Sequence, residues 1–448
     1  MLSDENKITY FISLLWLLFV FTFLLLIFVI YNLETLFSEE SFFEILKIFS
    51  VFIVLFFFIF KAHENSAIYL EKKGKINKAL FHYRVCYFFF PFSLRYKYNI
   101  GFFYLKNKKL EKAEKILKKL EKLVPDDIDI LNNLGFLYLY KNEFEKSYDY
   151  FLKSNYLKRG KPFDFGRIQR EVNFINITKI KHDMQQLAFL VKNKILNDSF
   201  LNICEEYKEI LEQNSNEQII NIPKEKYSFI KTYYGRNMYV YDKELPLKLL
   251  NNIEIKNFDK YLIIDNFLTN EALNYIYNYC LFSTIWNGDL KTGKYLCSYI
   301  DDGLNHTKFI FNLVRELQNF KVFRELKLIY AWAYKYDFNS EGIPIHSDKA
   351  KININFWITP QNSNNNQNNS GLIIYDILPT EDWTFYDYNS NTEKIKQFIK
   401  ENKPKEIIIP YKENRAVIFN SKLFHKTDKI DFKNSYENRR INITLLFE

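Results

Sequence analysis

His346 and Asp348 stand two positions apart in the segment IPIHSDK, at the end of a strand-like stretch. Side chains two positions apart on a strand point to the same side. An imidazole and a carboxylate presented together can supply two corners of a 2-His-1-carboxylate Fe(II) site, which needs one more histidine from elsewhere in the fold. His425, in the segment NSKLFHKTD, is the candidate for that third ligand.

Arg440 lies fifteen residues beyond His425 and opens the alternating segment RINITLLFE. Its guanidinium could hold a dicarboxylate cosubstrate through a bidentate contact. Arg439 would then point to the other side of the strand, and we expect it to be solvated. A register shift of one residue would exchange the two arginines.

Further polar residues share strand faces with these groups. Tyr334 and Tyr336 lie on one face, and we choose Tyr336 as a hydrogen-bond donor to the cosubstrate. Asn353 and Asn355 alternate with isoleucines, so they line the pocket if the isoleucines face the outer core, and Asn442 shares the face of Arg440. The same amides could instead make structural hydrogen bonds within the sheets.

The pattern His-x-Asp occurs by chance in many proteins, so another interpretation has to be weighed. A turn histidine followed by a surface aspartate, with His425 in a loop, would give the same letters. The order Tyr336, His346, Asp348, His425 and Arg440 within one strand-rich region favours the metal site.

The region that must position these residues begins near residue 256 and is built from short apolar runs. A helix from Asn270 to about Cys280 follows the first run, and a tract rich in Asn at 362–370 is expected to be an inserted flexible loop without function. The runs cover residues 261–268, 326–338, 351–359, 371–378, 406–411, 415–420 and 440–447. Seven such runs separated by turn-prone stretches predict an antiparallel sandwich or jelly roll.

Two hydrophobic segments lie at the N-terminus. Ile8–Tyr31 has no charged side chain and is long enough to cross a bilayer, and a shorter segment, Ile45–Phe60, contains Lys47. A signal peptide would have a shorter apolar run and a small-residue cleavage site. Glutamates lie between the segments and lysines follow them, which predicts that both ends face the cytoplasm. If the second segment did not insert, the rest of the chain would lie on the other side.

Residues 62–160 repeat with a period of 34. Small residues recur at two positions, and proline recurs at the turns: Ala67, Gly101 and Gly135; Ala79, Ala113 and Ser147; Pro91 and Pro125. This period, with small residues at helix-packing positions, is the tetratricopeptide pattern. A simple amphipathic bundle would lack the long-range register. Residues 161–255 are expected to form a helical connector.

Composition and charge narrow the classes of partner and of metal site. The 448 residues are 48% apolar and carry a net charge of +9. The excess is local, because residues 61–160 hold 21 Lys and Arg against 11 Asp and Glu. A basic stretch after a membrane segment suits an anionic lipid surface better than nucleic acid. Four widely spaced cysteines without a C-x-x-C pair indicate reduced thiols and argue against a zinc site.

Residues 260–448 resemble the 2-oxoglutarate and Fe(II)-dependent oxygenases near the prolyl-hydroxylase-like branch, especially bacterial oxygenase domains joined to tetratricopeptide repeats. The matching segments are YKYDFNSEGIPIHSDKAKININFWITP, GLIIYDI, NRAVIFNSKLFHKTDKI and YENRRINITLLF. The resemblance implies a metal held by His346, Asp348 and His425, with Arg440 pairing the C5 carboxylate of 2-oxoglutarate. It also implies hydroxylation, because the halogenating branch lacks the carboxylate that Asp348 supplies.

The sequence therefore predicts a multidomain α and β chain. Its parts are two transmembrane helices (1–61), an α-solenoid of tetratricopeptide-like repeats (62–160), a helical connector (161–255) and a double-stranded β-helix, or jelly roll (256–448). The predicted function is a membrane-anchored dioxygenase on the cytoplasmic side that uses Fe(II), 2-oxoglutarate and O2 and releases succinate and CO2.

The substrate could be a protein side chain, as the repeats favour, or an envelope-associated lipid or sugar, as the anchor favours. The alternative function is a membrane-tethered repeat scaffold that recruits a partner protein through its repeats and carries a non-catalytic jelly-roll binding domain.

Overall fold

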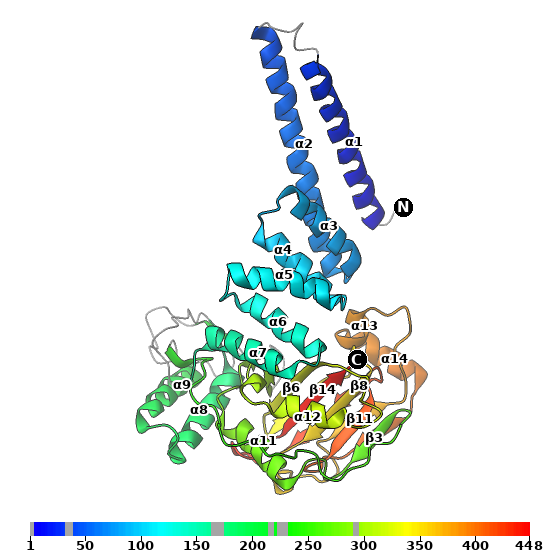
Figure 1. Cartoon of the computed structure of the whole chain (residues 1–448). Coiled ribbons are helices and arrows are strands. Elements are labelled where there is room, and N and C mark those ends of the chain that lie inside the picture. Colours follow the sequence, from blue (N-terminus) through cyan, green and yellow to red (C-terminus); the bar gives the residue numbers. More distant parts are fainter. Residues whose placement is uncertain (1–3, 32–38, 163–173, 214–218, 222–231, 290–294) are drawn as a thin grey trace. The chain divides into compact units, whose positions relative to one another are not determined.

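The computed structural model describes residues 4–31, 39–162, 174–213, 219–221, 232–289 and 295–448 (Figure 1). The chain separates into two compact units, residues 1–137 and residues 138–448. It is a mixed protein of many helices and antiparallel sheets. The four-part division of the sequence stays a prediction.

The first unit begins with two long helices, α1 (Asp4–Tyr31) and α2 (Glu39–Lys72). Their aromatic side chains pack together, as for Phe19 and Phe52, whose ring centroids are 4.5 Å apart. Among the described residues, one helix is long and apolar enough to cross a membrane, Leu46–Lys72, and 11% of its apolar window is buried. A core helix of a soluble protein would be mostly buried. The apolar stretch found in α1 is shorter, Leu15–Leu25, so one of the two predicted spans passes this test.

Shorter helices follow with a regular spacing. They are α3 (Ile76–Phe89), α4 (Leu94–Lys106), α5 (Leu110–Leu123), α6 (Ile128–Tyr140) and α7 (Phe144–Arg159). The first residues of α3, α5 and α7 are 34 positions apart, as are those of α4 and α6. Equivalent turns precede α3, α5 and α7, and each holds one residue with positive φ: Gly74 (68°), Lys108 (56°) and Asn142 (60°). The predicted period is therefore present in the helices themselves, of which α7 belongs to the second unit.

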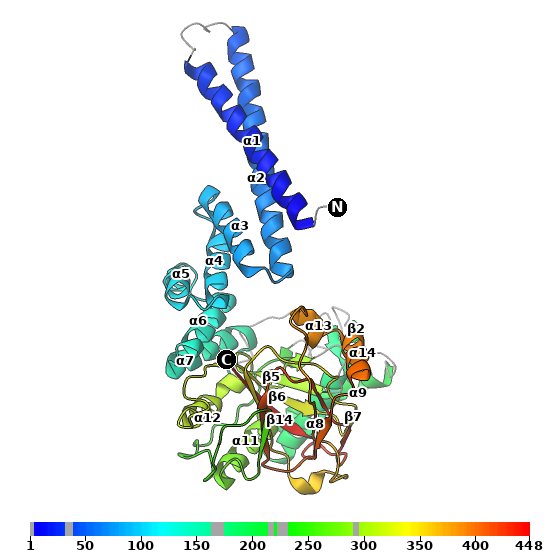
Figure 2. The ribbon, with the colours of Figure 1, turned by 90° about the vertical axis from the view of Figure 1, so that its right-hand side faces the viewer.

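The second unit contains the strands (Figure 2). Its helices after α7 are α8 (Ile177–Lys192), α9 (Leu201–Gln213), α11 (Asn270–Phe282), α12 (Phe309–Leu317), α13 (Phe385–Asn389) and α14 (Thr392–Asn402). Its strands are β1 (Phe174–Asn176), β2 (Ile219–Asn221), β3 (Tyr261–Ile264), β4 (Gly288–Asp289), β5 (Tyr295–Tyr299), β6 (Leu328–Tyr336), β7 (Asn339–Ser340), β8 (Ile352–Trp357), β9 (Leu372–Tyr375), β10 (Glu406–Ile409), β11 (Ala416–Asn420), β12 (His425–Thr427), β13 (Ile430–Asp431) and β14 (Ile441–Phe447).

Two antiparallel sheets dominate this unit. The larger has the order β3-β11-β8-β14-β6-β5-β4, and the smaller has the order β10-β9-β12. Each of the seven predicted apolar runs contains a strand, and the predicted helix after the first run is α11. Strand β12 was not predicted, because three residues are too few to show an alternating pattern.

The core between the sheets explains why the strands alternate. Trp357 and Val417 of the large sheet pack in one cluster with Leu372 and Ile374 of the small sheet. On β14, every second side chain is apolar and fully buried: Ile441, Ile443, Leu445 and Phe447. The helices α11 and α12 lie beside the large sheet (Figure 1). Both faces of the large sheet are therefore covered, and its inner face carries polar side chains such as Asn442 and Thr444 beside the apolar Trp357 and Val417.

Two expectations about single segments need correction. Arg439 is not solvated: it is 4% exposed, donates to the Gln185 side chain of α8 and forms an ion pair with Asp337 at 3.2 Å. The reason is that α8 covers this end of the large sheet. The Asn-rich tract has a structural role, because its last residue, Ser370, accepts a hydrogen bond from Arg440 through its carbonyl oxygen.

Candidate metal and cosubstrate site

The main chain brings the two histidines of the sequence motif together. The backbone N–H of His346 donates to the carbonyl oxygen of His425 at 3.0 Å, and the N–H of His425 donates to the carbonyl oxygen of His346 at 2.8 Å. The ring centroids are 4.4 Å apart. Asp348 follows, and its N–H donates to the Ser421 carbonyl oxygen at 3.0 Å. Hydrogen bonds thus hold the backbones of all three residues in place.

The ligand atoms converge. One ligand atom from each of His346, Asp348 and His425 lies within 4.8 Å of the other two. Nε2 of His346 is 3.7 Å from Oδ1 of Asp348, and Nε2 of His425 is 3.5 Å from Oδ2. Two imidazoles and one carboxylate at these separations fit the donor set of a non-haem Fe(II) site with open positions.

Neighbouring carbonyls set which imidazole nitrogen can bind a metal. Nδ1 of His346 lies 2.8 Å from the Pro344 carbonyl oxygen, and Nδ1 of His425 lies 2.9 Å from the Leu423 carbonyl oxygen. A carbonyl only accepts, so each Nδ1 carries the proton and each Nε2 presents a lone pair toward Asp348. This is the arrangement in which protein histidines bind metals.

The electrostatics keep His346 and Asp348 in the forms that bind a metal. Burial and the neighbouring His425 lower the pKa of His346, so its imidazole stays neutral at neutral pH. Burial raises the pKa of Asp348, but the interactions with the two histidines and the Asn353 amide outweigh it and leave the pKa below the ordinary value. The Asn353 Nδ2 donates to Oδ2 of Asp348 at 3.0 Å. Metal binding therefore displaces no proton from these two groups at neutral pH.

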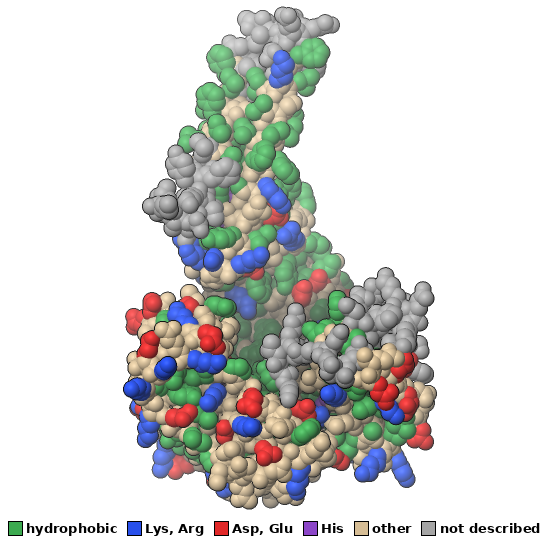
Figure 3. All heavy atoms as spheres, turned by 180° about the vertical axis from the view of Figure 1, so that it is seen from behind, with side chains coloured by type: hydrophobic (Ala, Val, Ile, Leu, Met, Phe, Trp, Pro, Cys, Tyr) green, Lys and Arg blue, Asp and Glu red, His purple; other side chains and the backbone are tan. Residues whose placement is uncertain are grey.

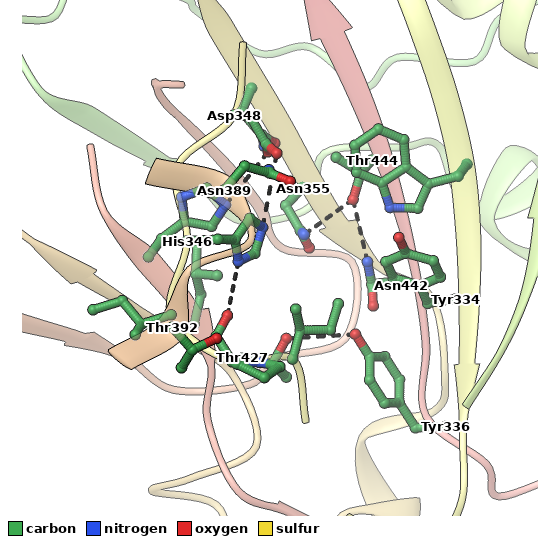
Figure 4. A pocket seen from close by; sticks show the side chains of 17 residues that line it. Tyr334, Tyr336, His346, Asp348, Asn355, Asn389, Thr392, Thr427, Asn442 and Thr444 are labelled. Carbon is green, nitrogen blue, oxygen red and sulfur yellow. Dashed lines mark hydrogen bonds and ion pairs between the residues drawn. The ribbon is translucent and has the colours of Figure 1, made fainter. Parts of the chain in front are cut away.

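The three ligands open into a cavity of about 270 Å³ between the two sheets (Figure 4). Its lining is mostly polar and uncharged: Trp332, Tyr334, Tyr336, Ile343, Pro344, Ile345, His346, Asp348, Asn353, Asn355, Leu372, Asn389, Thr392, His425, Thr427, Asn442 and Thr444. Among the described residues, the ionisable groups that line it are Asp348, the two histidines and the two tyrosines.

One wall of the cavity offers hydrogen-bond positions. Thr444 of β14 stands opposite Trp332 of β6 and Asn355 of β8, so the three side chains form a row across the inner face of the sheet. Figure 4 shows Asn355 and Thr444 across the cavity from Asn389. The indole N–H of Trp332 and the amide oxygens of Asn353 and Asn355 are buried and have no hydrogen-bond partner within the described chain. Buried polar atoms of this kind call for a ligand or water.

Arg440 does not line the cavity. It is 2% exposed, and its guanidinium donates to the Ser370 carbonyl oxygen at 2.8 Å and to Oδ1 of Asn442 at 3.0 Å. Three rings surround it, with centroids 4.9, 5.6 and 5.9 Å from Cζ: Tyr336, Trp357 and Tyr411. The Asn442 side chain, which does line the cavity, thus stands between Arg440 and the open space.

The structure places the predicted residues as follows. His346, Asp348 and His425 come together, and Tyr336, Asn353, Asn355 and Asn442 line the same cavity, whereas Arg440 contacts it through Asn442.

Several lining residues were missed. Trp332 and Thr444 could have been found, since Trp332 shares a strand face with Tyr334 and Tyr336, and Thr444 lies two positions from Asn442. Thr427, whose hydroxyl lies 3.4 Å from that of Tyr336, sits on the unpredicted strand β12. Asn389 and Thr392 come from short helices that gave no sequence signal.

Comparison with known proteins gives matches among solved structures alone. No family model matches the chain, and no curated protein matches it. HygX from Streptomyces hygroscopicus, solved with nickel and 2-oxoglutarate, is 7% identical with a TM-score of 0.30, and the match covers 42% of this chain and 82% of HygX. The carbocyclase SnoK from nogalamycin biosynthesis is 8% identical with a TM-score of 0.31, and the match covers 42% of this chain and 79% of SnoK.

EctD from S. alaskensis with bound Fe is 10% identical with a TM-score of 0.29, covering 42% of this chain and 73% of EctD. Likeness at these scores assigns no family, so the function proposed below is drawn from the side chains of this chain.

Proposed function

We propose that this protein is a membrane-anchored dioxygenase that uses Fe(II), 2-oxoglutarate and O2 to hydroxylate its substrate, releasing succinate and CO2. The observation that carries the proposal is the convergence of two imidazole Nε2 atoms on the Asp348 carboxylate, with each Nδ1 tied to a backbone carbonyl. The proposal includes a jelly roll as the domain's fold, tetratricopeptide-type repeats and a cytoplasmic orientation.

His346, Asp348 and His425 would hold the iron, which when bound supplies activation of O2 coupled to oxidation of 2-oxoglutarate. The chain's own residues prepare the site. The Pro344 and Leu423 carbonyls hold the protons at Nδ1, and Asn353 orients the carboxylate. The bonded backbones of the two histidines keep the ligand spacing without help from the metal.

The cosubstrate's distal carboxylate would bind at the end of the cavity formed by Tyr336, Thr427 and Asn442. Arg440 supplies positive charge there, since its guanidinium touches both Asn442 and the Tyr336 ring. A cation in a low-dielectric wall attracts a carboxylate more strongly than it would in water. In this arrangement Arg440 holds Asn442 in place as well as attracting the cosubstrate.

The substrate would bind against the row formed by Trp332, Thr444 and Asn355. This wall combines an indole N–H donor with an amide oxygen acceptor, both without a partner in the described chain. The Asn355 oxygen would repel a carboxylate substrate, and the Trp332 N–H would repel an ammonium. The wall therefore favours an uncharged polar group, such as an amide or a hydroxyl.

The test is succinate release from 2-oxoglutarate by the full chain in detergent with added Fe(II), under air, with a panel of peptide, lipid and sugar substrates. We expect turnover by the parent and loss of turnover by Asp348→Ala. Asp376→Ala is the matched control, because that carboxylate pairs with Lys260 at the surface of the same unit. Equal turnover in parent and Asp348→Ala, or none from the parent with any substrate, would contradict the proposal and favour the scaffold alternative.

A further inference from the structure

The turn between α3 and α4 exposes an unusual amount of apolar surface. It has the sequence FFFPF at residues 88–92. Phe88 is 79% exposed, Phe90 41% and Phe92 95%. Exposed apolar patches of this kind mark a binding surface for a partner or a membrane.

The repeat itself shows that the fold does not need these phenylalanines. The equivalent turn between α5 and α6 lies 34 residues further on and has a nearly identical backbone: φ and ψ are −127° and 71° at Phe90, and −136° and 78° at Val124. There the exposed positions that match Phe88 and Phe92 are Lys122 and Asp126. The same turn thus forms with charged residues, so the apolar character of the first turn serves something outside the chain's own packing.

The neighbours of the turn indicate what covers it. The Phe90 ring lies 4.5 Å, centroid to centroid, from Phe60, and the Phe89 ring lies 4.9 Å from Phe56. Phe56 and Phe60 belong to the apolar helix Leu46–Lys72. The exposed turn is therefore continuous with the surface of the helix that is long enough to span a bilayer.

Charged side chains border the apolar zone on one side. Lys61 follows Phe60 on α2, and Arg95 follows the turn, with side chains 51% and 62% exposed. Both pair with Glu64, which leaves them at the edge of the apolar surface. Figure 3 shows hydrophobic side chains along the upper helices and Lys and Arg side chains beneath them. Lysine and arginine at such a boundary reach lipid headgroups while their stems stay in apolar surroundings.

We propose that residues 88–92 insert into the lipid bilayer beside α2, at the boundary between headgroups and acyl chains. The proposal rests on the membrane anchoring in the proposed function. Interfacial segments of this kind bury their apolar side chains about 5–10 Å into the membrane. The turn would then fix the height of α3 and α4 relative to the membrane surface.

The experiment measures depth with a spin label in the full chain reconstituted in nanodiscs of phosphatidylcholine and phosphatidylglycerol. Phe92→Cys is compared with Asp126→Cys, the matched position of the next repeat, and labelled parent protein is the blank for the four native cysteines. We expect the label at 92 to collide with dissolved O2 severalfold more than with a water-soluble nickel complex. We expect the reverse at 126.

A label at 92 that meets the nickel complex as readily as the label at 126 would place the turn in water and overturn the proposal. A label at 92 shielded from both reagents would mean that a second copy or another protein covers the turn, which overturns it as well. Alkaline carbonate extraction tests the membrane anchoring separately from the position of the turn. A chain that washes off the membrane contradicts the anchoring itself, whereas a chain that stays while position 92 is aqueous contradicts the turn alone.

Discussion

His346 and His425 are hydrogen-bonded to each other in both directions through their backbones, at 3.0 and 2.8 Å. They are 79 positions apart in the sequence, and β12 holds His425 in the small sheet by pairing with β9. Because the main chain pairs these two residues and a carbonyl lies beside each Nδ1, the fold itself sets the spacing of the two imidazoles. A preorganised site of this kind loses less entropy on binding.

The orientation of Asp348 gives a first prediction. Asn353→Leu removes the amide that donates to Oδ2 of Asp348. Loss of such a supporting hydrogen bond weakens metal affinity by about 10- to 100-fold. Asn355→Leu is the control, since its amide lies on the same strand face and donates to Thr444 instead. The measurement is anaerobic titration with Fe(II) or Co(II). Equal affinities for the two variants would show that Asn353 does not support the ligand.

Adjacent arginines give a second prediction. Arg440→Gln removes the charge behind Asn442, and we expect the KM for 2-oxoglutarate to rise by about 10- to 100-fold, the range for a hydrogen bond with a charged partner. Arg439→Gln is the control on the opposite face, where it breaks the contacts with Asp337 and Gln185. That variant should lose stability while keeping its KM. If the KM rises in Arg439→Gln and not in Arg440→Gln, Arg439 attracts the cosubstrate and the prediction is wrong.

The polar wall gives a third prediction, on substrate class. In protein loaded with Zn(II) and 2-oxoglutarate, ligand-observed NMR should detect acetamide in the cavity and give a weaker signal for acetate. Asn355→Leu removes the unpartnered amide oxygen that would face the acetate carboxylate, so the preference for acetamide should be lost. Stronger binding of acetate than acetamide would contradict an uncharged substrate.

Seven strands of the two main sheets were predicted because their alternation is local, whereas β5 and β12 were not. The three candidate metal ligands were found because His-x-Asp and a later histidine can be recognised from their order in the chain. The alignment of neighbouring strands could not be predicted from the sequence in the same way. That Thr444 faces Trp332 and Asn355 depends on how β14 aligns with two strands far away in sequence. The burial of Arg439 was missed because α8, which covers it, lies in a region whose contacts have no sequence signature. Arg440 was placed on the correct face, but its bond to the Ser370 carbonyl depends on how a loop folds back.

An ion pair that joins α7 to the loop before α12, within the second unit, gives a fourth prediction. Arg159 makes two contacts with Asp302, through Nε at 2.8 Å and Nη2 at 2.5 Å, and both side chains are 9% exposed. Arg159→Ala leaves a buried carboxylate without its main partner, which costs about 3–5 kcal/mol. Lys158→Ala removes a half-exposed partner of the same carboxylate and should cost at most about 1 kcal/mol. Urea denaturation measures both. Equal losses would mean that the burial of the Arg159 pair has no energetic consequence.

The same contact region of α7 gives a prediction on pH. Nε2 of His306 lies 2.8 Å from the Asn155 side-chain oxygen of α7, and burial lowers the pKa of His306 to about 4 despite the nearby Asp302. Between pH 6.5, the ordinary value, and pH 4, the unfolded chain binds a proton at this residue and the folded chain does not. Stability therefore falls as pH falls through this window.

Asp302 does not contribute in that window. Arg159 and Lys158 outweigh burial and lower its pKa to about 2, so its stabilisation is lost only below its ordinary value of 3.8. His306→Gln keeps a side-chain donor for Asn155 without a titrating group. Urea denaturation of the parent and the variant at pH 7.5 and pH 5 should show a smaller loss of stability in the variant. The same loss in both would mean that His306 is as easily protonated in the folded chain as in the unfolded one.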